Sequence, residues 1–121
     1  FRGGATTYSI HEKTRLLKVD PGHAASVNCV SQRVTSEMAR GITELYKVQI
    51  GVATTGYAEP ISAPDLSVLE PYAYYAIWDC GARSSGLIKG EARDRVTCQA
   101  FYAETALHYL RLYLETRYGL G

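Results

Sequence analysis

The segment that most constrains the fold is 72–79, which reads Y-A-Y-Y-A-I-W-D. Its first seven residues carry no charge and show no alternation of polar and apolar positions, which is typical of a strand covered on both faces. Such a strand requires a packing layer on each side. We therefore expect a layered α/β domain in which this strand lies inside the sheet.

Helical periodicity is clearest near the end of the chain. Apolar residues recur there at steps of four and three, which predicts an amphipathic helix; they are Val96, Ala100, Ala103, Leu107, Leu110 and Leu114. Two further helices are predicted, one over 11–19 and one from an N-cap at Ser31 to about Tyr46. Between the two, Asp20-Pro21-Gly22 predicts a turn.

Three more strands complete the expected sheet. They are predicted over 1–9, over 48–54 and, as a short edge strand, over 86–90. The element order β-α-α-β-β-β-α predicts a mixed sheet with flanking helices, because the middle strands are too closely connected to be parallel. The size of 121 residues corresponds to a single domain, 1–121.

Composition excludes several classes of function. The net charge of +1 gives no reason to expect nucleic acid as a partner, and no apolar run is long enough to span a membrane. The three cysteines lack a C-x-x-C pattern and the three histidines share no ligand spacing, so we expect neither a metal nor a cofactor. Reduced thiols favour an intracellular, reducing compartment.

Tyrosine is the compositional outlier, with ten copies against two Phe and one Trp. Four of them lie within or beside the last predicted helix: Tyr102, Tyr109, Tyr113 and Tyr118. Amphipathic rings at helical spacing mark either a partner surface or a half-buried face, and both interpretations remain open.

One arrangement of residues can carry chemistry. Tyr8 and Ser9 end the first predicted strand, and Lys13 follows one turn into the next helix. Open α/β sheets place ligands where a strand ends and a helix begins. A partly desolvated lysine can act as a base for a hydroxyl nucleophile, because burial lowers its pKa. The simpler alternative is a turn with ordinary polar residues.

Two other groups are candidates for the same crevice. Thr54-Thr55-Gly56 ends the strand over 48–54, where hydroxyls and a glycine can line a binding site or simply cap the strand. Arg93-Asp94-Arg95 opens the last helix, where an arginine can clamp a phosphate or form a solvated helix start.

Several segments together resemble the C-terminal domain of the CinA family (competence/damage-inducible protein A). They are F-x-G-G-x-x-x-Y-S-x-x-x-K-x-x-L-L-x-V from Phe1, V-S-x-x-V-x-x-x-M-A-x-G from Val30, V-A-T-T-G-x-A-x-P from Val52, P-Y-A-Y-Y-A-I from Pro71 and R-D-x-V-x-x-Q-A from Arg93. The resemblance covers nearly the whole chain, in the correct order.

The resemblance implies a nicotinamide-nucleotide amidohydrolase, which hydrolyses nicotinamide mononucleotide to nicotinate mononucleotide and ammonia. It implies that Tyr8 and Lys13 activate a serine hydroxyl, with Thr55 and Arg93 orienting the substrate. Ser9 and Gly56 belong to the same motif steps and are assigned to substrate binding.

The chain also departs from the family pattern. Family members carry an earlier strand and helix with the segment A-E-S-C-T-G-G, so we expect this chain to be a domain without its first βα unit. Glu59 stands in place of a loop glycine, and Thr97 in place of a frequent helix arginine. Two hypotheses follow: an amidohydrolase-like domain that is inactive alone and needs a serine from another segment or chain, and a degenerate scaffold subunit. Both predict a homo-oligomer or a hetero-complex, because an open sheet edge attracts a partner strand.

Overall fold

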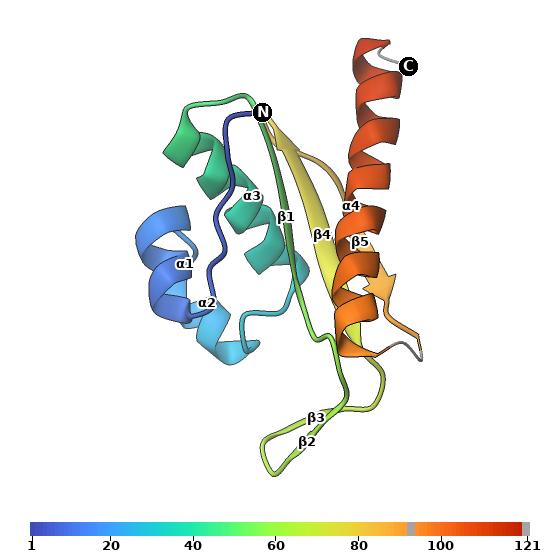
Figure 1. Cartoon of the computed structure of the whole chain (residues 1–121). Helices are drawn as coiled ribbons and strands as arrows, with labels where there is room; N and C mark the ends of the chain where they lie inside the picture. Colours follow the sequence, from blue (N-terminus) through green and yellow to red (C-terminus); the bar gives the residue numbers. More distant parts are fainter. Residues whose placement is uncertain (92–93, 120–121) are drawn as a thin grey trace.

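A three-stranded sheet separates two helical layers (Figure 1). The computed structural model describes residues 1–91 and 94–119. Helices α1 to α3 cover one face and α4 covers the other, so the predicted layered α/β architecture with flanking helices is confirmed. The elements are α1 Ile10–Leu17, α2 Pro21–Ser26, α3 Gln32–Tyr46, β1 Ile50–Gly56, β2 Ile61–Ala63, β3 Leu66–Val68, β4 Tyr72–Asp79, β5 Ala82–Lys89 and α4 Arg95–Tyr118.

The sheet has the order β1-β4-β5, with β4 in the centre as its apolar sequence predicted. Val52 lies opposite Ile77 on one side of β4, and Tyr75 lies opposite Gly86 on the other. Every pair among the described strands is antiparallel, so the predicted mixed sheet is corrected to an antiparallel one. Short connections favour antiparallel pairing, because a parallel crossover needs a dozen or more residues.

The segment 1–9 is not the strand that its sequence predicts. It runs beside β1 without joining the sheet (Figure 1), and Gly3 has a φ of 149°, outside the range of a strand. Two of its backbone carbonyls accept hydrogen bonds from side chains rather than from a strand. Tyr46 Oη donates to Gly4 O at 3.0 Å, and Lys13 Nζ donates to Thr7 O. The outer edge of β1 therefore carries no paired strand in the described part of the chain.

Two local predictions also need correction. Asp20-Pro21-Gly22 begins α2 rather than forming an isolated turn, because Asp20 Oδ1 accepts from Gly22 N and Pro21 occupies the first helical position. The proline-rich connection before β4 contains the β2–β3 hairpin, and the predicted edge strand over 86–90 is longer, as β5.

Each face of the sheet has its own apolar core. Leu17, Val34 and Met38 belong to the core beneath α1 to α3, while Ile77 and Tyr102 belong to the core beneath α4. The predicted last helix is confirmed, with Asp94 as N-cap and Gly119 as a left-handed C-cap. Its buried face, however, consists of Cys98, Tyr102 and Ala106 rather than of the predicted apolar stripe. Two residues of that stripe are largely exposed, Val96 at 74% and Leu107 at 59%.

The tyrosines of α4 form a half-buried face toward the sheet. Tyr109 stacks on Tyr75 with the ring planes 1° apart, and Tyr113 donates to Asp79 Oδ2 at 2.6 Å. Tyr118 donates to the same oxygen. Of the two interpretations, the half-buried face is therefore the one that the packing supports. No helix in the described part of the chain combines the length and hydropathy that a bilayer crossing requires.

Candidate functional site

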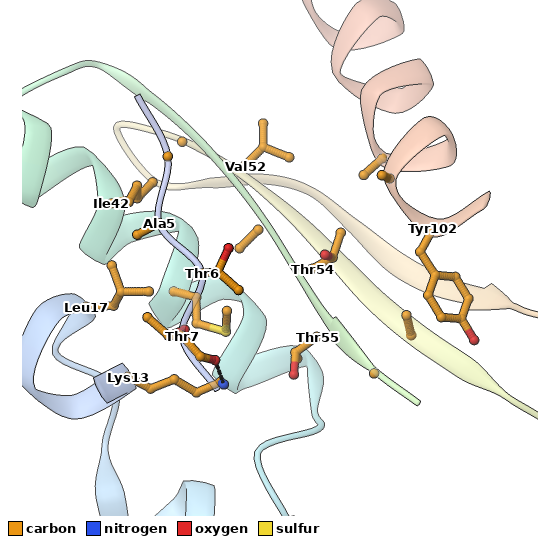
Figure 2. Close-up of a pocket in the computed structure, with 18 of the residues that line it drawn as sticks. Ala5, Thr6, Thr7, Lys13, Leu17, Ile42, Val52, Thr54, Thr55 and Tyr102 are labelled. Carbon is orange, nitrogen blue, oxygen red and sulfur yellow. Dashed lines mark hydrogen bonds between the residues drawn. The ribbon is translucent and has the colours of Figure 1, made fainter. Parts of the chain in front are cut away.

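Lys13 is the centre of the candidate site. Ser9 caps α1 by accepting a hydrogen bond from Glu12 N at 3.1 Å, which fixes the start of the helix. Lys13 and Leu17, four residues apart, then lie on the buried face of α1, and Lys13 is only 6% exposed. Its Nζ donates to Thr7 O at 2.5 Å (Figure 2). A lysine thus occupies a position that an apolar residue would normally fill.

Burial changes the acid–base behaviour of this lysine. Desolvation lowers the pKa of Lys13 below its usual value, because a low-dielectric environment disfavours the charged ammonium, and the nearby Cys29 thiol opposes that shift. No ion pair joins Lys13 to a carboxylate among the described residues. The site therefore holds an ammonium group that loses its proton at a lower pH than a surface lysine does.

The end of β1 forms the opposite wall. Thr55 Oγ1 donates to Cys29 O at 2.9 Å, which joins β1 to the loop between α2 and α3. Gly56 follows at the strand end, where an added Cβ would lie 2.4 Å from Ala73 Cα. A side chain at position 56 therefore cannot fit beside β4, so close strand packing is a sufficient reason for this glycine.

The loop between α2 and α3 forms a third wall. Asn28 and Cys29 adopt left-handed backbone conformations, with φ of 52° and 63°. Asn28 Nδ2 donates to Tyr57 Oη at 3.1 Å, so the loop is tied to the segment after β1 by this bond as well as by Thr55. Sequence reasoning missed Asn28, Cys29 and Tyr57 as site residues. The only signal was a cysteine two residues before the N-cap Ser31.

These walls border an open cavity of about 1400 Å³. The cavity follows the free edge of β1, from Lys13 and Thr55 on one side of the sheet to Tyr102 on the other (Figure 2). Leu107 of α4 also belongs to its lining. Its described lining includes two basic side chains, Arg2 and Lys13, and no aspartate or glutamate. The remaining lining is largely apolar. Within the described lining, the basic side chains that a bound molecule could contact are therefore Arg2 and Lys13.

The other predicted site residues have different environments. Tyr8 lies at the rim with 92% of its surface exposed, and its hydroxyl bonds to no other described residue. Ser9 lies outside the described lining of the cavity, and its hydroxyl oxygen accepts the capping bond of α1. Arg93 falls outside the described residues, while Arg95 pairs with Glu59 at 2.8 Å. The structure thus brings Lys13 and Thr55 to one cavity, with Tyr8 at its margin.

No cluster of three or more metal-ligating side chains occurs in the described part of the chain. His23 Nε2 lies 2.9 Å from Ser31 Oγ, the N-cap of α3. This histidine is engaged at the start of α3.

The fold and the cavity define an α/β domain with a lysine-centred crevice at the free edge of its sheet. A sequence profile for the CinA C-terminal domain matches residues 1–114. The chain belongs to this family, as the motifs around Lys13 and Thr55 suggested. The resemblance is thereby confirmed at the level of the family.

Curated proteins named as CinA-like are similar in sequence to nearly the whole of this chain. A CinA-like protein of Geobacter sp. (strain M21) is 36% identical over 97% of this chain, and a CinA-like protein of Chlorobium limicola is 32% identical over 98%. The chain spans 28% of the length of each of these relatives.

Solved structures agree with the fold. The competence damage-inducible protein A (ComA) of Klebsiella pneumoniae aligns with a TM-score of 0.80 at 27% identity, covering 93% of this chain and 68% of that one. A CinA superfamily protein of Escherichia coli aligns with a TM-score of 0.74 at 26% identity, covering 86% of this chain and 59% of that one.

Proposed function

We propose that this domain supplies the general base for amide hydrolysis of a nicotinamide nucleotide, with Lys13 as that base. The observation that carries the proposal is a lysine that is 6% exposed, has a lowered pKa and faces a large cavity. A base works best when its pKa lies closer to the working pH, and burial moves an amine in that direction. The CinA resemblance supplies the substrate class.

The proposed reaction is acyl transfer to a serine hydroxyl. Neutral Lys13 accepts the hydroxyl proton while the serine oxygen attacks the carboxamide carbon of nicotinamide mononucleotide. Return of that proton to the leaving nitrogen releases ammonia and leaves an acyl ester. Water then hydrolyses the ester to nicotinate mononucleotide and frees the serine. We propose that the serine comes from a further segment or chain lying against the free edge of β1.

The charge of the cavity supports a nucleotide as substrate. A mononucleotide carries a phosphate, and Arg2 of the described lining is a permanent cation that no lining carboxylate opposes. A volume of about 1400 Å³ also exceeds what a molecule of that size requires. By resemblance, Tyr8 assists Lys13, while Thr55, Ser9, Gly56 and Arg93 contact the substrate.

A second function is favoured by a different observation. Part of the apolar stripe of α4, including Ala103 and Leu107, lines the open cavity, and Leu107 is 59% exposed. An exposed apolar surface beside an unpaired strand edge is suited to association. We therefore keep, as the alternative, a catalytically degenerate scaffold that joins a homo-oligomer or a larger complex through this edge.

Ammonia release from nicotinamide mononucleotide tests the two functions. The assay compares the wild-type chain with Lys13→Ala and with Lys89→Ala, which removes an exposed lysine on β5. Turnover that Lys13→Ala abolishes and Lys89→Ala preserves would rule out the scaffold. Absence of turnover, together with a stable stoichiometric complex with another chain that also fails to release ammonia, would rule out the enzyme.

A further inference from the structure

Helix α4 has two faces that can pack against a neighbour, and the sheet covers one of them. Cys98, Tyr102 and Ala106 are the residues that pack on the sheet. At about 100° per residue, the apolar stripe is centred roughly 120° around the helix from them. Four members of that stripe are exposed and the last two are half-buried: Val96, Ala100, Ala103, Leu107, Leu110 and Leu114. The stripe is thus a second face, largely open to solvent in the described part of the chain.

The spacing of this stripe is that of a helix that packs along another helix. Its residues alternate in steps of four and three over 96–114, which is the heptad pattern of paired helices. The contacts with the sheet do not account for this pattern, because the sheet packs against other residues of α4. Since α4 is already folded against the sheet, pairing requires no new helix formation. A second helix therefore fits this face.

Two opposite charges flank the stripe on one side. Glu104 directly follows Ala103, and Arg111 directly follows Leu110, a heptad position whose charges set the partner and the orientation of paired helices. Glu104 is exposed and forms no ion pair among the described residues. Arg111 is bound to Glu115 of its own helix at 2.8 Å, with 76% of the Arg111 side chain exposed. Such an exposed pair contributes little, so Arg111 can exchange it for a new partner.

We propose that α4 pairs with α4 of a second copy of this chain, antiparallel about a two-fold axis near His108. That axis places Leu107 of one copy opposite Leu110 of the other. It also places Glu104 opposite Arg111, and the symmetry makes each contact twice. In a parallel, in-register pair the two charged residues would lie about 10 Å apart along the helix axis. The charges therefore favour the antiparallel pair.

The exposed area of the chain is sufficient for such an interface. A folded chain of 13.3 kDa is expected to expose about 6,500 Å². This chain exposes 7503 Å². The excess of about 1,000 Å² exceeds the area of about 800 Å² that each partner buries in a stable interface.

This pairing gives the second proposed function, association beside the free edge of β1, a defined partner, and it rests on that function alone. Lys13 lies on α1, on the opposite side of the sheet from α4, and takes no part in the pairing. Dimerisation and ammonia release can therefore fail independently. A dimer without turnover supports the pairing, and a monomer with turnover supports only the hydrolase.

Sedimentation equilibrium of the full chain tests the pairing at concentrations up to about 100 μM, where an interface of this size is populated. We expect a monomer–dimer equilibrium without larger species, because a two-fold contact is closed. Leu107→Glu should weaken dimerisation at least about a hundredfold, because it places two unpaired carboxylates at the centre of the interface.

Leu112→Glu is the matched control on the same helix. Leu112 is 42% exposed on another face of α4, so its variant should dimerise as wild type does. A monomeric wild type or an open-ended series of oligomers would overturn the proposal. Equal dimerisation by Leu107→Glu and Leu112→Glu would overturn it as well.

Charge reversal tests the antiparallel orientation without altering the apolar stripe. Glu104→Arg and Arg111→Glu each bring like charges together, and each should weaken dimerisation at least about tenfold. The double variant should recover most of the wild-type affinity, and so should an equal mixture of the two single variants, because opposite charges then meet again. Recovery in neither case would overturn the antiparallel pair. These exposed substitutions decide the matter even if Leu107→Glu does not fold.

Discussion

Asp79 is a buried carboxylate that joins the C-terminal part of α4 to the sheet, and its removal is a sharp test of the fold. The residue ends β4 and is 3% exposed. Three side chains donate to it: Tyr113 at 2.6 Å, Tyr118 at 2.5 Å and Gln49 at 2.8 Å. We predict that Asp79→Asn destabilises the domain, because an amide has one acceptor oxygen where the carboxylate has two.

The magnitude follows from those three hydrogen bonds. A hydrogen bond to a charged group contributes about 1.5–3 kcal/mol to stability, but partly exposed donors recover some of that from water. For Asp79→Asn we therefore expect a loss of about 2 kcal/mol in the free energy of unfolding, and for Tyr113→Phe a smaller loss. The two losses should not add, since both substitutions alter the same hydrogen-bonded group.

The pKa shifts fix the direction of the pH dependence. Hydrogen bonds from Tyr113 and Tyr118 hold the pKa of Asp79 below its usual range, and the same bonds raise the pKa of each tyrosine. The carboxylate contributes stability above its unfolded pKa of about 3.9, and this contribution is lost as the pH falls through the lower folded pKa. The tyrosines contribute fully below about pH 10 and lose their contribution as the pH rises through their higher folded pKa.

Urea unfolding followed by circular dichroism measures these effects for wild type, Asp79→Asn, Tyr113→Phe and the double variant. Glu115→Gln is the matched control, because its exposed pair with Arg111 should contribute less than about 0.5 kcal/mol. The reasoning is refuted if Asp79→Asn changes stability no more than Glu115→Gln does. It is also refuted if the effects of Asp79→Asn and Tyr113→Phe are fully additive.

Three further predictions use the same measurement. Ser9→Ala removes the N-cap of α1 and should cost about 1 kcal/mol of stability, and a neutral result would show that the cap is dispensable. Gly41→Ala places a Cβ about 2.1 Å from a backbone oxygen of α1 and should cost about 2 kcal/mol, whereas Gly4→Ala, which meets nothing within 4 Å, should be nearly neutral. Tyr102→Phe removes a buried hydrogen bond of 2.6 Å to a backbone carbonyl and should cost about 1–2 kcal/mol; an unchanged midpoint would contradict that bond.

Helices α1, α3 and α4 and the central strand were predictable because their signals are local. Ser31 and Asp94 are capping residues, and the apolar run before Asp79 identifies β4 without knowledge of its neighbours. The segment 1–9 was mispredicted because its run of small residues is compatible with a strand, whereas its carbonyls accept hydrogen bonds from the side chains of Lys13 and Tyr46. Such contacts join distant parts of the chain and leave no periodic pattern in the sequence.

The buried face of α4 shows a second limit of sequence patterns. The stripe containing Val96 and Leu107 is the more apolar one, yet the sheet packs against Cys98, Tyr102 and Ala106. A pattern of apolar residues gives little weight to tyrosine, because tyrosine carries a hydroxyl. Its ring nevertheless buries a large area once that hydroxyl has a hydrogen-bond partner. The hydroxyl of Tyr102 finds that partner in a carbonyl that sequence inspection does not reveal.

The candidate site was predictable in part. Lys13 and Thr55 were identified from a strand-end and helix-start pattern and from the CinA resemblance, and both line the cavity. Asn28, Cys29 and Tyr57 were not identified, because their positions depend on the fold of the loop between α2 and α3. The roles of all these residues in catalysis or binding remain predictions for experiment.

Calorimetric titration with nicotinamide mononucleotide tests most directly whether the Lys13 crevice is a nucleotide site, since it does not require a nucleophile. Wild type, Lys13→Ala and Lys89→Ala are compared at equal concentration. We predict saturable binding to wild type and Lys89→Ala, and binding at least about tenfold weaker, roughly 1.4 kcal/mol, to a folded Lys13→Ala. The account is contradicted if wild type shows no binding, or if Lys13→Ala binds as tightly as wild type.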